Sequence, residues 1–205
     1  MTGQQRRLQI IEVGRRLFSE RGFDAASIEE IANRAGVSKP VVYEHFAGKA
    51  SLYAEVVDRE TQRLLDRITN SLVGEDPRQL VEQAANALLS YIEDEPDGFR
   101  ILVRDSPVAH SSSRFASLIV DVTRQVEHLL AAEFQARGYD PKLAPLYSQA
   151  LVGMVALVGQ WWLEAREPSR GQVAAHLVNL AWNGLSHLDP KPLVRGARRR
   201  RSEDV

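Results

Sequence analysis

Several classes of protein are excluded by what this 205-residue chain lacks. It has no cysteine, so a disulfide framework, a thiolate metal site and a cysteine nucleophile are ruled out. The chain also has no glycine-rich phosphate loop, no His-x-x-x-His or Glu-x-x-His pair and no nucleophile elbow. We therefore expect no enzyme activity, no bound metal and no cofactor. Apolar and polar residues do not alternate over any sustained stretch, which argues against a β-sheet fold. No sequence repeat of 20 to 50 residues occurs, which argues against a solenoid.

The N-terminus lacks the uninterrupted apolar stretch of a secretory signal, because charged residues such as Arg6, Glu12 and Arg16 recur through it. We therefore expect a cytoplasmic protein. Hydrophobic residues make up 44% of the chain, which is enough for a true core.

A net charge of only −1 hides an uneven distribution. Residues 1–50 carry eight Lys and Arg against six acids, residues 51–190 carry twelve against nineteen, and residues 191–205 carry six against two. A basic front and tail therefore flank an acidic middle. This pattern predicts that the front of the molecule, rather than its middle, faces any nucleic-acid phosphates.

Apolar residues recur at helical spacing along the chain, so the predicted fold is all-α with about nine helices. The first helix ends at Gly22, and Ser27-Ile28-Glu29-Glu30 has the form of a capping box that opens a short second helix. Ala35-Gly36-Val37 ends that helix. Ser38 then caps a third helix that runs to Phe46, with Pro40 in its first turn.

A long helix is predicted from Lys49 to about Leu72, followed by a boundary at Gly74-Glu75-Asp76-Pro77. Proline-containing breaks separate the later helices, and Ser169-Arg170-Gly171-Gln172 forms a second capping-box pattern. We expect these later helices at 77–95, 97–104, 112–137, 142–167 and 170–187. The tail from residue 190 onward, with four consecutive arginines at 198–201, is expected to be disordered.

Two short helices joined by Ala-Gly-Val between longer helices have the spacing of a helix-turn-helix. Gly36 can take the positive φ that the tight bend needs, and Val37 can fill the angle between the helices. With Gly22-Phe23, Ser27-Ile28 and the Val37-Ser38-x-x-x-x-Tyr43-x-x-Phe46-x-x-Lys49 spacing, residues 6–60 strongly resemble the DNA-binding domain of tetracycline-repressor-type (TetR/AcrR) regulators. Beyond residue 60 only the helical layout and the length match.

The resemblance implies a helix-turn-helix DNA-binding domain at 1–48, a helical effector-binding and dimerisation domain at 49–189, and a basic tail at 190–205. Within the first domain it implies phosphate contacts from the serines, Tyr43, His45 and Lys49, a guanine contact from Lys39, and apolar contacts to a thymine methyl from Pro40 and Val41. The expected DNA-binding residues are Ser27, Ser38, Lys39, Pro40, Val41, Tyr43, His45 and Lys49. The alternative is that Tyr43 merely packs and Lys39 is merely solvated. Val37, Val42 and Phe46 are interpreted as core.

One such domain is too small for tight specific binding, so a homodimer on a two-fold symmetric operator is expected. The last helix carries an apolar stripe, and together with the preceding helix it suits the intersubunit four-helix bundle that the family uses. The predicted interface residues are Leu151, Val155, Val158, Trp162, Val173, Leu177, Leu180, Ala181, Gly184 and Leu185.

No charged residue occurs from Leu143 to Leu163, a run long enough to span a bilayer. Pro145, Ser148, Gln149 and Gln160 interrupt it. A buried interface helix is therefore preferred over a membrane span, and no membrane partner is expected.

The middle helices are expected to line an apolar effector pocket as in the family, although plain core is the alternative for each residue. The candidates are Tyr91, Phe99, Leu102, Phe115, Ile119, Val122, Met154 and Trp161.

The leading hypothesis is a homodimeric, sequence-specific DNA-binding regulator. It acts as a repressor that an apolar or amphipathic small molecule releases from a palindromic double-stranded DNA operator. The alternative is a helical protein-interaction adaptor that retains the helix-turn-helix as a scaffold. The arginine cluster of the tail either stays solvated or adds sequence-independent phosphate contacts.

Overall fold

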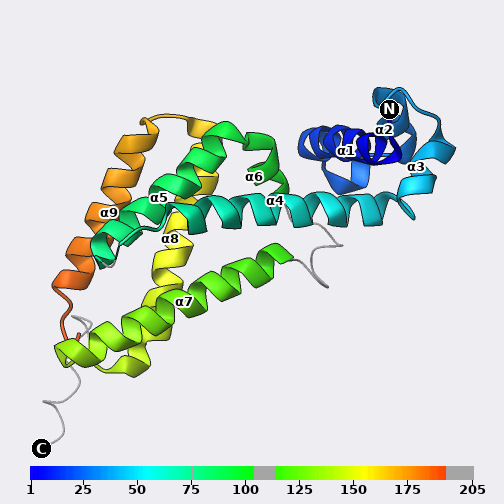
Figure 1. The fold of residues 1–205 in the computed structure, drawn as a ribbon. Helices are drawn as coiled ribbons and strands as arrows, with labels where there is room; N and C mark the ends of the chain where they lie inside the picture. Colours follow the sequence, from blue (N-terminus) through cyan, green and yellow to red (C-terminus); the bar gives the residue numbers. More distant parts are fainter. Residues whose placement is uncertain (75, 104–113, 193–205) are drawn as a thin grey trace, which may run out of the picture.

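The computed structural model describes residues 1–74, 76–103 and 114–192, with the backbone alone at 77, 114–119 and 121. The regular structure in these ranges is entirely helical, which confirms the all-α prediction (Figure 1). The helices are α1 (Gly3–Ala25), α2 (Ile28–Arg34), α3 (Lys39–His45), α4 (Lys49–Ser71), α5 (Pro77–Asp94), α6 (Pro96–Val103), α7 (Arg114–Arg137), the 3₁₀ turn η1 (Pro141–Leu143), α8 (Ala144–Ala165) and α9 (Arg170–Ser186). The expected segment at 198–201 lies outside the described residues.

Local signals in the sequence set the ends of the first helices. The chain leaves helical geometry at Gly22, where φ is 77°. The Ser27 side chain caps α2 by accepting a hydrogen bond from the backbone N–H of Glu30 at 3.1 Å. The Glu30 carboxylate itself pairs with Arg21 and Arg34. The serine cap is therefore confirmed, while the glutamate stabilises α2 through ion pairs.

The bend between α2 and α3 forms as the Ala-Gly-Val segment predicts. Gly36 adopts a left-handed φ of 62°, which a side chain with a Cβ rarely takes. The Val37 N–H donates to the Ala32 carbonyl at 3.0 Å and closes the turn. Helix α3 then begins at Lys39, directly after the predicted N-cap Ser38, and Pro40 fits a first turn that needs no N–H. The Ser38 side chain itself makes no capping hydrogen bond.

The long helix α4 runs along the molecule from the end that holds α2 and α3 to the opposite end, where it lies beside α5 (Figure 1). It packs against α1 near its start and against α5, α6 and α7 further on. One continuous set of buried residues extends from Ile10 in α1 through Leu52 in α4 to Trp162 in α8. The first three helices and the rest of the molecule therefore share a core, with α4 as its axis.

The remaining helices form two closely packed pairs, α5 with α9 and α7 with α8. Helix α8 begins after η1 and ends at Ala165, shorter than the predicted 142–167, because Arg166 takes a left-handed φ of 57° just before Pro168. The capping box at the start of α9 is confirmed, since the Ser169 N–H donates to Gln172 Oε1 at 3.1 Å.

Candidate nucleic-acid interface

Helix α3 presents its polar side chains outward at the end of the molecule farthest from α9 (Figure 1). Lys39 and Pro40 are exposed, and the Tyr43 side chain is 49% exposed. On the opposite face Val42 and Phe46 are buried, and Val37 packs partly against the same core. The interpretation of these three apolar residues as core is confirmed. The buried face of α3 therefore packs against the core, and its exposed face is accessible to a binding partner.

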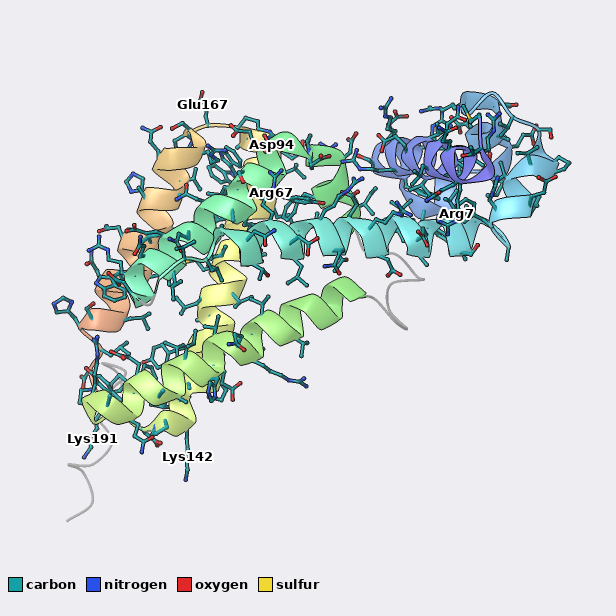
Figure 2. All side chains as sticks on the ribbon, in the orientation of Figure 1. Arg7, Arg67, Asp94, Lys142, Glu167 and Lys191 are labelled. Atoms are coloured by element: carbon teal, nitrogen blue, oxygen red, sulfur yellow. The ribbon has the colours of Figure 1, made fainter. Side chains whose placement is uncertain are left out.

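An ion pair between α1 and α4 fixes the base on which α3 rests. Arg7 Nη1 donates to Glu55 Oε1 at 3.0 Å, and its guanidinium lies 4.8 Å from the centre of the Phe46 ring (Figure 2). Hydrogen bonds from Arg7 and then Arg59 lower the pKa of Glu55 from 4.5 to about 2. The carboxylate therefore stays charged, and the contact holds, throughout the neutral range.

A depression of about 440 Å³ lies beside α3. Four of the predicted DNA-binding residues line it, from three different helices or their caps: Ser27, Lys39, Tyr43 and Lys49. The Ser27 hydroxyl oxygen accepts the capping bond from Glu30, so its own proton is available to an outside acceptor. The other four predicted residues, Ser38, Pro40, Val41 and His45, follow one another along α3 and its N-cap.

Lys49 is held more firmly than the sequence suggested. Its Nζ donates to the carbonyl oxygens of Asp24 at 3.1 Å and Ala26 at 3.0 Å, and lies 4.5 Å from the centre of the Phe23 ring. An ammonium has three donors, so one N–H remains for a phosphate. Lys49 therefore ties the start of α4 to the end of α1 as well as presenting charge.

The positive charge of the front is mostly neutralised within the fold. Arg16, Arg21 and Arg34 all pair with glutamates of α1 or α2. Lys39, in contrast, has no carboxylate partner in the part of the chain that the structure describes. Counts of charged residues along the sequence could not reveal which of these arginines are paired, because an arginine and its glutamate partner can lie as many as 14 positions apart, as Arg34 and Glu20 do.

The structure places the expected effector-pocket residues in different surroundings. Tyr91, Phe99 and Leu102 are buried, Val122 and Met154 pack against the same core, and Phe115 and Ile119 lie outside the described residues. Trp161 is 53% exposed, whereas the other described candidates are buried or partly buried. A hollow of about 260 Å³ beside Tyr91 is lined by this tyrosine and four charged residues, Arg63, Asp66, Arg67 and Glu95.

The predicted interface residues fall into two groups. The assignment of Trp162 to the dimer interface was wrong, because this residue is buried in its own protomer and its indole N–H donates to the Pro168 carbonyl at 2.8 Å. The same correction applies to Val173, Leu177 and Ala181, which are buried on a helix that packs against α5. Leu180 and Gly184 are exposed, and Leu151, Val155, Val158 and Leu185 are partly exposed.

One exposed apolar side chain on α8, Leu157, was not among the predicted interface residues. Leu157 is 67% exposed and lies one turn before Trp161 on α8, while Leu180 on α9 is 64% exposed. The i, i+4 spacing of Leu157 and Trp161 placed them on one face, but a helix with so few polar residues does not readily reveal which face points inward. The segment Pro141–Ala165 contains an 18-residue window with a mean hydropathy of 1.3, which by length and composition is enough for a membrane span, and 17% of that window is buried in the protomer.

Comparison with known proteins matches both the helix-turn-helix segment and the helices that follow it. A family model described as bacterial regulatory proteins, tetR family, matches residues 10–56, and one described as a tetracyclin repressor-like C-terminal domain matches residues 67–197. The HTH-type transcriptional activator FasR of Mycolicibacterium smegmatis is 32% identical over 197 residues, covering 93% of this chain and 86% of that protein.

Two solved structures share the fold. A TetR-like transcriptional regulator from Rhodococcus sp. RHA1 superposes with a TM-score of 0.73 at 24% identity, over 89% of this chain and 97% of that one. NalD, the secondary repressor of the MexAB-OprM multidrug efflux pump in Pseudomonas aeruginosa, gives a TM-score of 0.68 at 24% identity, over 88% and 95%.

Proposed function

Because the chain belongs to the TetR family of bacterial regulatory proteins and is a DNA-binding transcription regulator, we propose that it works in the cytoplasm as a homodimeric repressor that a small molecule releases from a palindromic operator. The observation that carries the proposal is the outward face of α3. It offers Lys39, Pro40 and Tyr43 to solvent while Val42 and Phe46 anchor it from behind.

The residues around α3 divide by chemistry into two roles. Lys39 would bind the O6 and N7 acceptors of guanine, and Pro40 and Val41 would contact a thymine methyl. Tyr43, His45, Lys49 and the hydroxyls of Ser27 and Ser38 would bind phosphate oxygens and orient the helix in the major groove. Because most arginines of the front are already paired, binding would depend on these few groups rather than on a broad basic surface.

The dimer would bury the exposed apolar residues of the last two helices. Leu157 and Trp161 on α8 and Leu180 on α9 are large and exposed in the protomer, so burying them against a second copy removes apolar surface from water. An intersubunit bundle of α8 and α9 accounts for the apolar surface of α8 without a membrane. It also holds two α3 helices at a spacing set by the protein.

An effector would act by changing that spacing. Two recognition helices enter successive major grooves when they lie roughly 34 to 36 Å apart. An apolar or amphipathic molecule that binds among α4 to α8 would favour a different spacing and so lower operator affinity. Helix α4 is suited to transmit the change, because it contacts α1 at one end and α5, α6 and α7 further along.

Footprinting on the intergenic DNA beside the gene, with the purified full chain, tests the proposal. Wild-type protein should protect a symmetric site, and Lys39→Ala with Tyr43→Ala should abolish protection. Lys142→Ala removes the same charge at the opposite end of the molecule and should leave it unchanged (Figure 2). Unimpaired binding by the double variant would contradict the assignment of α3 as the DNA-binding helix. If wild-type protein protects no DNA even at low salt, the proposal that it binds an operator in this intergenic region is wrong.

The direction of regulation needs its own experiment, since FasR is named an activator and NalD a repressor. A transcriptional reporter driven by the protected promoter should rise when the gene is deleted. A fall would instead identify the protein as an activator.

A further inference from the structure

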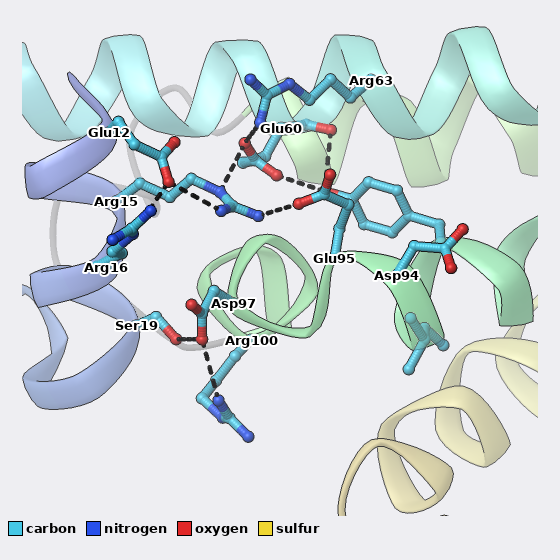
Figure 3. Close-up of polar contacts among 12 residues, drawn as sticks. Glu12, Arg15, Arg16, Ser19, Glu60, Arg63, Asp94, Glu95, Asp97 and Arg100 are labelled. Atoms are coloured by element: carbon cyan, nitrogen blue, oxygen red, sulfur yellow. Dashed lines mark hydrogen bonds and ion pairs between the residues drawn. The ribbon is translucent and has the colours of Figure 1, made fainter. Parts of the chain in front are cut away.

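A buried polar cluster joins the DNA-binding end to the rest of the molecule at a point separate from α3. Arg15 of α1 extends into the gap between α4 and the corner where α5 meets α6 (Figure 3). Its Nε donates to Glu60 Oε1 at 3.1 Å, its Nη2 pairs with Glu95, and its Nη1 lies 3.6 Å from Glu12. One guanidinium therefore connects α1 both to α4 and to the residue that precedes α6.

Glu60 at the centre of this cluster is 1% exposed. Its carboxylate accepts hydrogen bonds from Arg15, from Arg63 Nη1 at 2.6 Å and from the Tyr91 hydroxyl at 2.7 Å. A buried carboxylate left without partners is strongly destabilising, so these donors must stay in place while Glu60 is buried. The attraction of Glu60 and Glu95, followed by Glu12 and Asp97, outweighs the effect of burial and raises the pKa of Arg15.

Helix α6 comes unusually close to this cluster. A Cβ on Gly98 would lie 1.9 Å from Glu60 Oε2 and 2.6 Å from the Tyr91 hydroxyl, so the α6 backbone rests directly against the buried carboxylate. A second link lies on the next turn of α1, where the Ser19 hydroxyl donates to Asp97 Oδ1 at 2.7 Å. We call the set Arg15, Ser19, Glu60, Tyr91, Glu95 and Asp97 the Arg15 junction.

The junction differs from the other ion pairs of α1 in what its rupture would cost. Arg16 and Glu12 form an exposed pair within one helix, and pairs of this kind contribute little to stability because water screens them. Moving α6 away from α1 would instead separate Arg15, whose side chain is only 10% exposed, from Glu95, and the largely buried guanidinium would lose a partner that water can replace only in part. A contact of this kind holds in one arrangement or breaks, and therefore transmits a displacement rather than absorbing it.

We propose that the Arg15 junction couples the position of α6 to operator affinity, with Arg15 as a positioning residue for DNA binding. It supplies a path between the two halves of the chain in addition to α4. The inference rests on the proposed docking of α3 on an operator. Coupling of this kind is reciprocal, so operator binding must also stabilise α6. That reciprocity allows a test without knowledge of the effector.

The test compares two variants that each remove one carboxylate from Arg15. Glu95→Gln cuts the ion pair between α1 and the α5–α6 corner, whereas Glu12→Gln removes a carboxylate of α1 itself and leaves the link between elements intact. Both change the net charge equally. Amide hydrogen exchange is followed by mass spectrometry for the full chain, alone and with a saturating duplex carrying the footprinted sequence, and with an unrelated duplex of the same length.

In wild-type protein and in Glu12→Gln, the footprinted duplex should slow exchange both in α3 and in α6. In Glu95→Gln it should still slow exchange in α3 while protection of α6 is lost, and operator affinity should fall about five-fold, the lower end of usual couplings between sites. Glu12→Gln should stay within about two-fold of wild type. Arg15→Met, checked by thermal unfolding, should reproduce the loss at α6 if it folds.

The outcomes distinguish failure of the Arg15 junction from failure of the proposed DNA binding by α3. Protection of α3 without protection of α6 in wild-type protein would overturn the junction and leave the DNA-binding assignment standing. Equal protection of α6 in Glu95→Gln and wild type would overturn it as well. Absence of protection at α3 in wild-type protein would instead contradict the proposed function.

Discussion

Gly98 illustrates how little room single residues have where α6 meets α4. We predict that Gly98→Ala lowers the free energy of unfolding by about 1–3 kcal/mol, because the new Cβ would overlap the buried Glu60 carboxylate and the Tyr91 hydroxyl. Gly171→Ala is the control, since nothing lies within 4 Å of the added atom. It should be neutral or stabilising by up to about 1 kcal/mol in urea unfolding. Equal behaviour of the two variants would contradict the close approach.

Tyr43 allows the phosphate role to be separated from base reading. Tyr43→Phe keeps the exposed ring and removes its hydroxyl, so we predict a loss of about 1 kcal/mol, or about five-fold, in affinity for the operator and for unrelated duplexes alike. Tyr147→Phe on α8 makes the same change at a distance from α3 and should have no effect. Fluorescence anisotropy titrations measure both. A loss confined to the operator would show that the hydroxyl reads a base.

At the scale of elements, the pair that joins α1 to α4 makes stability depend on pH. Glu55 has a pKa of about 2 in the folded protein and an ordinary value of 4.5, so its stabilisation is fully present above about pH 4.5 and is lost as the pH falls toward 2. Because Arg7 and Glu55 are both about a third exposed, we expect about 1 kcal/mol after solvent screening.

Urea unfolding of wild type and Glu55→Gln between pH 7 and pH 2 checks this prediction. The difference in unfolding free energy should be about 1 kcal/mol at pH 7 and shrink as the pH falls below 4.5. Glu29→Gln removes an exposed carboxylate of α2 that makes no ion pair among the described residues, and it should show no such trend. A difference for Glu55→Gln that is constant with pH would contradict the ion-pair explanation.

At the scale of the whole molecule, the proposed dimer depends on the exposed faces of α8 and α9, and only a dimer brings two α3 helices to one operator. We predict that Leu157→Lys with Leu180→Lys yields monomers in analytical ultracentrifugation, because lysines cannot be buried unpaired in an apolar interface. Thermal unfolding should confirm that the protomer still folds, since both side chains are exposed in it. Operator affinity should fall at least 100-fold while weak nonspecific binding persists.

Leu129→Lys provides the control for this dimer prediction. Leu129 is a similarly exposed leucine, but it lies on α7, outside the proposed bundle. This variant should remain dimeric and bind the operator as wild type does. A dimer that survives the two changes on α8 and α9 but dissociates with Leu129→Lys would move the interface to α7.

The sequence by itself determined the helix-turn-helix and the order of the helices. Ser27, Gly36 and Pro40 act on backbone groups within a few residues of themselves, and the apolar spacing around Val42 and Phe46 distinguishes the inner face of α3 from its outer face. Such signals are local, so they can be read without knowing what packs against the segment. They also carried the resemblance from which the DNA-binding residues were inferred.

Only the tertiary structure decided the facing of α8 and the existence of the Arg15 junction. Helix α8 carries few polar residues, and the choice between Trp161 and Trp162 as the inward residue depended on where α5 and α6 lie. Arg15 meets Glu60 across 45 positions of sequence and Glu95 across 80. No pattern along the chain indicates which of its 27 acids an arginine will meet, because packing of α1, α4 and α6 sets those distances.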